Sequence, residues 1–317
     1  SYKLDFSASQ SKFDRKYLGG STSEYKSLVN EFSIQDTIKY SHDSTLTLAA
    51  NKQNFDYLNN DVKYNTKALF ISNTNKFENL LLSEVLRYDN FSAFDEKITG
   101  KLGAKYFFTE SLNISANYAT AFNSPSLFNL SYTPDLQPET AKSLDINIEF
   151  NALKFTYYET KVDNMINYVS NSWPNTQYEN IKGKTILKGY ELSYSDAITD
   201  NVLLSANYAR LKTKDAEGKA LSRRIKDKIN VSLDYYGLKK FHFNVNGAYV
   251  GERFDSADNK GAQTGKYSLF NAVVNYEIND NLKTYLKLDN ITDKFYQTID
   301  GYGTAGRAAY VGLKASF

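Results

Sequence analysis

The strongest constraint on the fold is an alternation of apolar and polar residues, with a period of two, that recurs along the chain. Residues 143–150 (SLDINIEF) carry aliphatic and aromatic side chains at every second position and Ser, Asp, Asn and Glu between them. Residues 229–236, 241–249, 281–290 and 307–317 alternate in the same way. Such a period is typical of a β-strand with one apolar and one polar face. Because no helical period separates these segments, the sequence predicts an all-β protein.

Composition distinguishes between two kinds of all-β protein. Aromatic residues make up 15% of the chain, including 26 Tyr and 20 Phe, whereas Pro occurs only 4 times and the mean hydropathy is −0.52. A soluble sandwich would need longer apolar segments to fill its core. A transmembrane β-barrel needs one face in lipid, one face in water and aromatic girdles at both interfaces. Lysine and aspartate at mid-strand are costly in lipid but harmless in a wet lumen. A membrane barrel is therefore favoured.

The predicted connections alternate between short turns and long polar loops. Short turns are expected at 41–44, 74–77, 108–111, 151, 197–201, 236–240 and 279–281. Long loops are expected at 14–26, 57–63, 89–95, 123–140, 167–184, 212–224, 251–268 and 291–306. Short periplasmic turns at one rim and long extracellular loops at the other are the layout of an outer-membrane barrel. The count predicts an antiparallel up-and-down barrel with roughly sixteen strands present, in a single domain over residues 1–317.

Several other classes of protein are disfavoured. A net charge of +2 without a basic cluster argues against a nucleic-acid partner. There is no cysteine, no apolar run of about 18 residues for a transmembrane helix and no signal peptide, so we expect a mature protein or a fragment. The two histidines, His42 and His242, are predicted to lie far apart, which disfavours a metal pair or a Ser/His triad. Acidic residues in 251–268 could hold calcium, but a solvated loop is favoured. We expect no enzyme activity, no metal site and no cofactor.

Four stretches resemble TonB-dependent outer-membrane receptors. The segment NITDKFY (290–296), followed by GR at 306–307, is similar to the loop and strand that end the family's barrel. DLQPETA (135–141) resembles a strand entry of the family, and YENIKGKTILKGYE (178–191) resembles one of its strands. LSRRIKDKINVSLDY (221–235) resembles the entry that follows the next long loop. The four stretches occur in the family's order across about two-thirds of the chain.

The resemblance implies a barrel of about 22 strands with an N-terminal plug inside it. This chain would then be the C-terminal part of the barrel, without the plug and the first strands, and TonB would bind through the missing N-terminal region. The implied function is energised uptake of a scarce, bulky nutrient across the bacterial outer membrane. GYGTAGR (301–307) and the pair Arg223-Arg224 most resemble cobalamin (vitamin B12) transporters, so the predicted ligand is a cobalamin-like corrinoid. A ferric siderophore receptor binding an iron chelate, or a passive sixteen-stranded porin, remains an alternative.

Receptors for large ligands gather their contacts on extracellular loops and the upper lumen wall, where aromatic and polar side chains stack and hydrogen-bond. On that argument, five residues in the long loops are candidates for binding the substrate. They are Tyr132, Trp173, Tyr178, Arg253 and Tyr302. The alternative for each is an interfacial girdle position or a role in loop packing.

The last strand also resembles the signal by which the barrel-assembly machinery recognises its clients. Tyr310 would be the leading residue and Gly312 the glycine, with Ala315 and Phe317 at the apolar positions. The other interpretation is simply a closing strand in contact with outer-membrane lipid, and both interpretations can hold together.

Overall fold

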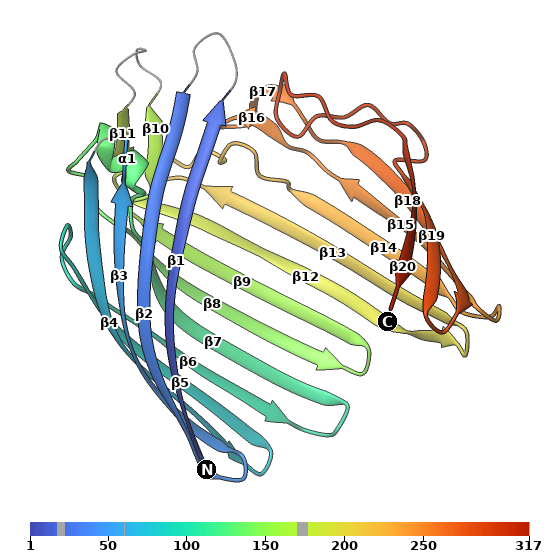
Figure 1. The fold of residues 1–317 in the computed structure, drawn as a ribbon, viewed down its shortest axis with the longest axis horizontal. Coiled ribbons are helices and arrows are strands. Elements are labelled where there is room, and N and C mark those ends of the chain that lie inside the picture. Colours follow the sequence, from blue (N-terminus) through green and yellow to red (C-terminus); the bar gives the residue numbers. More distant parts are fainter. Residues whose placement is uncertain (18–22, 60, 170–176, 317) are drawn as a thin grey trace. The chain divides into compact units, whose positions relative to one another are not determined.

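The computed structural model describes residues 1–317 apart from 18–22, 60, 170–176 and 317. The described residues form twenty strands and one short helix (Figure 1). The first eleven elements in chain order are β1 (Tyr2–Tyr17), β2 (Ser23–Ser41), β3 (Ser44–Tyr57), β4 (Val62–Phe77), β5 (Leu80–Phe91), β6 (Lys97–Phe107), β7 (Leu112–Asn123), α1 (Leu127–Tyr132), β8 (Glu139–Phe150), β9 (Leu153–Asp163) and β10 (Ile166–Val169). The remaining elements are β11 (Gln177–Asn180), β12 (Lys184–Thr199), β13 (Val202–Lys214), β14 (Asp227–Tyr235), β15 (Phe241–Val250), β16 (Phe254–Ser256), β17 (Lys260–Gln263), β18 (Tyr267–Asn279), β19 (Leu282–Asp289) and β20 (Ala308–Ala315).

Sixteen of these strands form one antiparallel sheet, which confirms the predicted fold class and strand number. Their order is β1-β2-β3-β4-β5-β6-β7-β8-β9-β12-β13-β14-β15-β18-β19-β20, so neighbours in the chain are neighbours in the sheet. The other four strands form two small hairpins, β10–β11 and β16–β17, each inserted in a long connection. Among the described residues, no helix has the length and apolar character needed to cross a membrane.

Six of the seven predicted short turns lie where the sequence placed them, and one is wrong. Instead of turning at 74–77, β4 continues to Phe77, which pairs with Leu80 at the start of β5. The turn is made by Glu78 and Asn79, with Glu78 in the left-handed region at a φ of 48°. The polar run at 74–77 is therefore strand, because its residues find ladder partners across the hairpin.

Contacts between residues divide the described chain into two compact units. Unit 1 comprises Ser1–Phe108, Ile114–Asp145 and Thr160–Thr185. Unit 2 comprises Thr109–Asn113, Ile146–Glu159 and Ile186–Phe317. The expectation of a single barrel domain stays a prediction.

The two faces of the sheet in unit 1 differ as the alternation predicted. One row of mutually opposite residues runs across β1 to β6 and consists of Phe6, Ile34, Ala50, Leu69, Tyr88 and Ile98. Phe6 is 72% exposed and Leu69 is 62% exposed, although both are large and apolar. A soluble sheet would bury such a row, whereas a membrane barrel turns it toward lipid. We call this side the apolar face.

The opposite side, which we call the polar face, carries hydrogen-bonding and charged residues. Ser7 and Ser33 lie opposite each other on β1 and β2, with their Oγ atoms 2.7 Å apart. Asp89 on β5 is buried on this face, and Arg87 donates to both of its carboxylate oxygens at 2.7 and 2.8 Å. A buried carboxylate needs such a partner because an unpaired one would be strongly destabilising.

Candidate functional site

Aromatic side chains gather on the polar face of unit 1, at the end where the strands lead into long connections. Tyr57 ends β3, Tyr64 lies near the start of β4 and Phe91 ends β5, so all three reach the same end of the sheet. The ring centroids of Phe55 and Tyr64 lie 4.8 Å apart, and those of Phe91 and Phe122 lie 5.4 Å apart. Aromatic pairs at such distances add stability beyond the area they bury. The cluster is therefore a well-packed platform on the side away from lipid.

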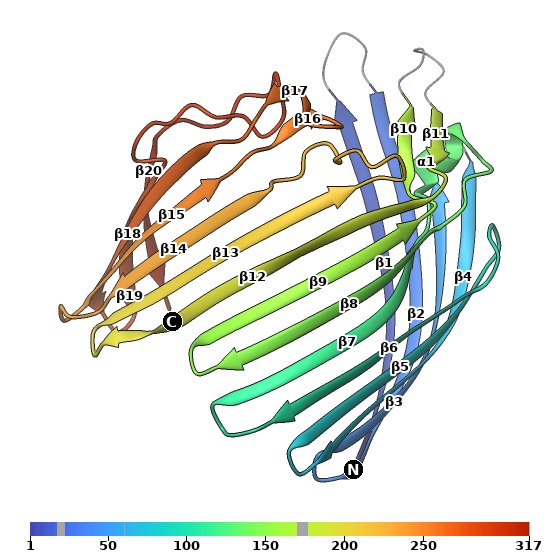
Figure 2. The ribbon, with the colours of Figure 1, turned by 180° about the vertical axis from the view of Figure 1, so that it is seen from behind.

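The helix α1 packs on this platform through Leu127 and Leu130. It lies beside the β10–β11 hairpin, as Figures 1 and 2 both show. Ser126 caps its first turn: the Ser126 Oγ accepts from the Asn129 N–H at 3.1 Å, and the Ser126 N–H donates to Asn129 Oδ1 at 3.1 Å. Leu127 and Leu130 are buried against the aromatic rings. A helix of only six residues gains little from its intrinsic propensity, so this capping box and the two leucines hold it in place.

Two polar side chains tie the base of the β10–β11 hairpin to neighbouring segments. The Asn180 side chain accepts from the Gln137 N–H at 2.9 Å and donates to the Gln137 O at 2.9 Å and to the Asn164 O at 2.8 Å. Glu139 Oε1 accepts from the Ile166 N–H at 2.6 Å. Asn180 and Glu139 both belong to stretches that resemble the receptor family. In this structure they position loops.

A cavity of about 540 Å³ lies between α1 and the polar face of β1 to β4. This volume falls within the range of pockets that bind small molecules and cofactors. Two basic residues, Arg15 and Lys26, are among the residues that line it. The Nζ of Lys26 is paired with Glu24 Oε2 at 2.7 Å. The aromatic side chains that line the cavity are Phe13, Tyr25, Phe55, Tyr57, Tyr64 and Phe128. Such walls can stack on a flat ligand and donate hydrogen bonds from tyrosine hydroxyls.

Two of the predicted site residues, Tyr132 and Tyr178, meet at the edge of this cavity. The ring of Phe128, which lines the cavity, lies 5.1 Å from the ring of Tyr132 and 6.4 Å from that of Tyr178. Burial raises the pKa of the Tyr178 hydroxyl, and the nearby hydroxyls of Tyr168 and Tyr132 act in the same direction. Tyr178 is therefore a neutral hydrogen-bond donor at neutral pH.

The sequence did not point to Phe128, Tyr25 or Phe13 as pocket residues. Phe128 lies within the predicted loop 123–140, where Ser126, the N-cap of α1, is a local signal of a helix start. The sequence predicts a loop over 14–26 that includes Tyr25, but β1 extends to Tyr17 and β2 begins at Ser23. The longer strands carry the pocket residues onto the polar face, and that length depends on cross-strand pairing.

The other predicted site residues lie in unit 2 or outside the described residues. Arg253 is only 8% exposed, and its guanidinium donates to the Thr264 Oγ1 at 3.0 Å, the Thr264 O at 2.7 Å and the Gln297 O at 2.9 Å. Tyr302 is 70% exposed at the tip of the last loop. Trp173 lies outside the described residues. For these three residues, ligand binding stays a prediction.

The loops of unit 2 are joined by ion pairs and hydrogen bonds. Glu252 contacts the Nζ atoms of Lys226 at 2.8 Å and Lys266 at 2.9 Å, and these two ammonium groups lower the Glu252 pKa to about 2. Asp255, one of the possible calcium ligands, accepts instead from Arg223 Nε at 3.3 Å and from the Asp300 N–H at 2.9 Å. Arg223 thus pairs with a loop acid.

Asn290, the first residue of the NITDKFY segment, organises the turn before the last loop. Its side chain accepts from the Lys294 N–H at 2.9 Å and donates to the Lys294 O at 3.0 Å. Its own N–H donates to Asn271 Oδ1 at 2.9 Å. Asp293 Oδ1 accepts from the Arg307 N–H at 2.8 Å, which brings the end of the loop back to its start. The resemblance at this segment therefore reflects a set of backbone clamps.

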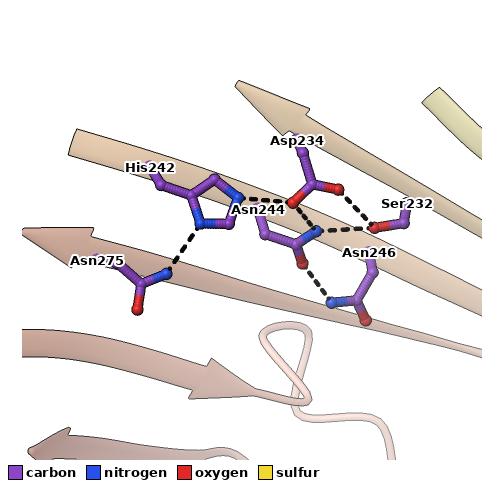
Figure 3. A network of polar contacts seen from close by, with 6 residues as sticks. All are labelled: Ser232, Asp234, His242, Asn244, Asn246 and Asn275. Carbon is purple, nitrogen blue, oxygen red and sulfur yellow. Dashed lines mark hydrogen bonds and ion pairs between the residues drawn. The ribbon is translucent and has the colours of Figure 1, made fainter. Parts of the chain in front are cut away.

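A row of polar side chains crosses β14, β15 and β18 on the polar face of unit 2 (Figure 3). Asp234 Oδ1 accepts from Asn244 Nδ2 at 3.0 Å and lies 2.7 Å from His242 Nε2. Asn244 Oδ1 accepts from Asn246, whose own Oδ1 accepts from Asn271 at 2.9 Å. Asn271 links this row to the Asn290 turn. Each of these side chains forms a hydrogen bond with the next one, which rigidifies this part of the sheet.

The residues of the predicted assembly signal lie on β20 or beyond its end. Tyr310, Gly312 and Ala315 belong to the strand, and Phe317 lies outside the described residues. A Cβ added at Gly312 would lie 2.5 Å from Cζ of the Tyr285 ring, so the glycine makes room for an aromatic residue on β19. Recognition by the assembly machinery stays a prediction.

Comparison with known proteins agrees with the fold. Among curated proteins, the vitamin B12 transporter BtuB of Vibrio cholerae serotype O1 is 27% identical over 255 residues, which are 76% of this chain and 41% of that protein. BtuB of Vibrio vulnificus is 28% identical over 261 residues, which are 80% of this chain and 42% of that protein. The chain thus spans about two-fifths of the length of these relatives.

Solved structures show the same fold. The ferric enterobactin receptor PfeA of Pseudomonas aeruginosa matches 100% of this chain and 59% of its own, with a TM-score of 0.78 at 16% identity. The ferric-catecholate import receptor Fiu of E. coli K12 matches 100% of this chain and 62% of its own, with a TM-score of 0.74 at 16% identity.

The family model described as TonB dependent receptor-like, beta-barrel, matches residues 2–291, which is most of the sheet and its loops. Members of this family are outer-membrane transporters and receptors, not enzymes. The exposed apolar face, the sixteen-stranded antiparallel sheet and this match lead to one conclusion. The chain belongs to the TonB-dependent receptor family of outer-membrane β-barrels.

Proposed function

We propose that this chain is the C-terminal part of a receptor barrel that takes up cobalamin or another corrinoid. The observation that carries the proposal is the aromatic cavity beneath α1, at the long-loop end of the polar face. Curated relatives at 27% and 28% identity are vitamin B12 transporters, which supports a corrinoid as the ligand. A corrin ring is large and flat, and aromatic walls with tyrosine hydroxyls suit such a ligand.

The mechanism needs binding and conformational change but no covalent chemistry. The ligand would bind first at the long loops, with one end against Phe128 and the tyrosines beside it. TonB would then act through a region N-terminal to this chain and open the path through the barrel. The clamps at Asn180 and Glu139 would keep the α1 segment and the β10–β11 hairpin in place during binding.

A ferric siderophore is the second candidate, because the basic residue Arg15 lies beside the aromatic rings of the cavity. A base beside aromatic rings suits an anionic, aromatic iron chelate through charge-assisted hydrogen bonds and stacking. The match to the receptor family favours both candidates over a passive porin.

The test measures binding of cyanocobalamin and of ferric enterobactin to the purified full-length receptor by titration calorimetry. We expect tight binding of cyanocobalamin and weak or no binding of the iron chelate. Phe128→Ala should weaken cyanocobalamin binding roughly 10-fold, because a buried aromatic anchor usually contributes more than 1 kcal/mol. The control is Phe295→Ala, since Phe295 is 74% exposed in a loop of unit 2.

Tight binding of ferric enterobactin alone would replace the first candidate with the second. Binding of neither ligand, together with steady ion conductance in a planar bilayer, would favour the porin. Equal effects of Phe128→Ala and Phe295→Ala would remove the cavity from the proposal. Heat-modifiable migration on a gel shows whether each variant has folded.

A further inference from the structure

Two lysines face each other on the apolar face of unit 1. Lys52 on β3 and Lys67 on β4 are directly opposite in the register, and both are exposed. Among the described residues, neither ammonium group forms an ion pair or hydrogen bond with the protein. Like charges directly opposite each other on a sheet are destabilising. The chain maintains this repulsion on the face that turns toward lipid.

The same two strands pair charges differently a short distance away. Asp56 on β3 lies opposite Lys63 on β4, two pairs further toward the long loops on the same face. Lys63 is also paired with Asp61 at 3.3 Å. The two acidic residues of this hairpin, Asp56 and Asp61, therefore lie near Lys63, which is farther from the apolar row than Lys52 and Lys67 are. In the part of the chain that the structure describes, the outer neighbours of Lys52 and Lys67 in the register are Phe32 and Asn90, and neither is an acid.

A groove of about 1070 Å³ runs between this lysine pair and the exposed apolar row. Small residues, Ala8 and Ala50, leave space on the apolar face, and larger side chains such as Phe32 and Leu69 border it. The amide of Asn90 lies beside the lysine end and donates to the Tyr88 hydroxyl at 3.4 Å. The groove is thus apolar at one end and carries two positive charges at the other.

The position of the lysines along the strand sets their depth in the membrane. β3 leaves the short turn that follows Ser41 and passes Ala50 before it reaches Lys52. In an outer-membrane barrel, short turns are periplasmic and long loops are extracellular. The lysine pair therefore lies on the extracellular side of the apolar row, toward the headgroups of the outer leaflet. A single lysine there would be explained by extension of its side chain to the interface. Two opposed lysines at the end of an apolar groove favour an anion between them, because it would offset their repulsion.

We propose that Lys52 and Lys67 bind the phosphate of a phosphorylated lipid in the outer leaflet, with one acyl chain of that lipid in the groove beside Ala8 and Ala50. The phosphate offsets the repulsion between the ammonium groups, as anionic headgroups do for basic clusters at membrane surfaces. The apolar groove distinguishes a lipid from a soluble anion, because free phosphate has nothing to place there. This site is separate from the cavity under α1, so it does not depend on the identity of the transported ligand.

The experiment uses the purified full-length receptor and lipid A, a phosphorylated glycolipid, with bound lipid counted by native mass spectrometry. The double variant Lys52→Gln/Lys67→Gln should bind lipid A roughly 30-fold more weakly than the wild type, because each lysine near an anionic surface contributes about a fivefold effect. Ala50→Phe should also weaken binding, because it fills the groove without changing the charge. Lipid A with its phosphates removed should bind the wild type as weakly as intact lipid A binds the double variant.

The matched control is Lys12→Gln/Lys63→Gln, which removes two lysines from the same face at its extracellular end. This control should bind lipid A as the wild type does. An equal loss in the control, or unchanged binding by Lys52→Gln/Lys67→Gln or by Ala50→Phe, would overturn the proposal. Displacement of lipid A by millimolar inorganic phosphate would overturn it too, since the site would then prefer a soluble anion.

Discussion

At the scale of single residues, the segments that resemble the receptor family contain glycines where neighbouring atoms come close, and side chains that hydrogen-bond to the backbone of loops. Gly189 in the YENIKGKTILKGYE segment is an example. A Cβ added at Gly189 would collide with the backbone O of Arg210 on the paired strand and would lie 2.7 Å from the Tyr158 Oη. The glycine is required by its neighbours, since no unusual φ is present there. The sequence shows the glycine but not the tyrosine that packs against it.

Gly189→Ala should therefore destabilise the folded receptor by about 1–3 kcal/mol, the usual cost of adding a methyl group to a closely packed site. Gly303→Ala is the control, because a Cβ added at Gly303 has no atom within 4 Å. Urea titration of the refolded full-length receptor in lipid vesicles gives both free energies of unfolding. Equal stability of the two variants would show that the space around Gly189 is not tight.

At the scale of elements, ion pairs and hydrogen bonds join the loops of unit 2. Arg253 joins the loop that carries β16 and β17 to the last loop through the Gln297 O, and Asp255 does so through the Asp300 N–H. Glu252 joins the start of β14 to the start of β18 through Lys226 and Lys266. These contacts connect segments that are far apart in the sequence, so no local pattern could predict them.

The stability of these loops should depend on pH through Glu252. Its folded pKa of about 2 lies below the usual value of 4.5, so its stabilising contribution is fully present above pH 4.5 and is lost as the pH falls toward 2. Glu252→Gln should lower the thermal midpoint at pH 7 and leave it unchanged near pH 2. Circular dichroism melts of the wild type and the variant at both pH values test this.

Glu110→Gln, in an exposed turn, is the control for that experiment and should not change the midpoint at either pH. High salt should reduce the effect of Glu252→Gln at pH 7, because exposed ion pairs are screened. If the thermal midpoints of the wild type and Glu252→Gln differ at pH 2 by as much as at pH 7, the ion pairs of Glu252 are not the cause of the difference.

At the scale of the whole molecule, the dominant property is the separation of an apolar face from a polar face. On β14, Val231 points to the apolar side and is 42% exposed, whereas its neighbour Asn230 points to the side that carries Ser232 and Asp234. In a barrel within the outer membrane, the first side meets lipid and the second meets water. Adjacent positions on one strand therefore tolerate very different substitutions.

Val231→Lys should destabilise the membrane-inserted receptor by up to about 2–4 kcal/mol, the cost of a lysine on the lipid face near the bilayer centre. Asn230→Lys should cost much less, because its side chain faces the wet side. Folding into lipid vesicles, followed by urea titration, compares the two variants. A larger loss for Asn230→Lys would mean that the two faces are assigned the wrong way round.

Much of the fold could be predicted because its signals are local. Period-two alternation and the choice of turn residues predicted roughly sixteen strands and located six of seven short turns. The error at 74–77 arose because polar residues near a turn remain in a strand when the facing strand offers partners, as Leu80 does for Phe77. The candidate site was predicted only in part. Tyr132 and Tyr178 meet at Phe128, but Tyr25 reaches the cavity only because β2 begins at Ser23, inside the predicted loop.

The sequence by itself determined the class of the protein, its strand faces and its family, since these depend on spacing along the chain and on short motifs. The tertiary structure decided which residues meet: Phe128 with the tyrosines of the hairpin, Arg253 with the last loop, and Lys52 with Lys67. Those meetings depend on strand register and loop packing. Both are set by contacts between segments distant in the sequence, where alternation alone carries no information.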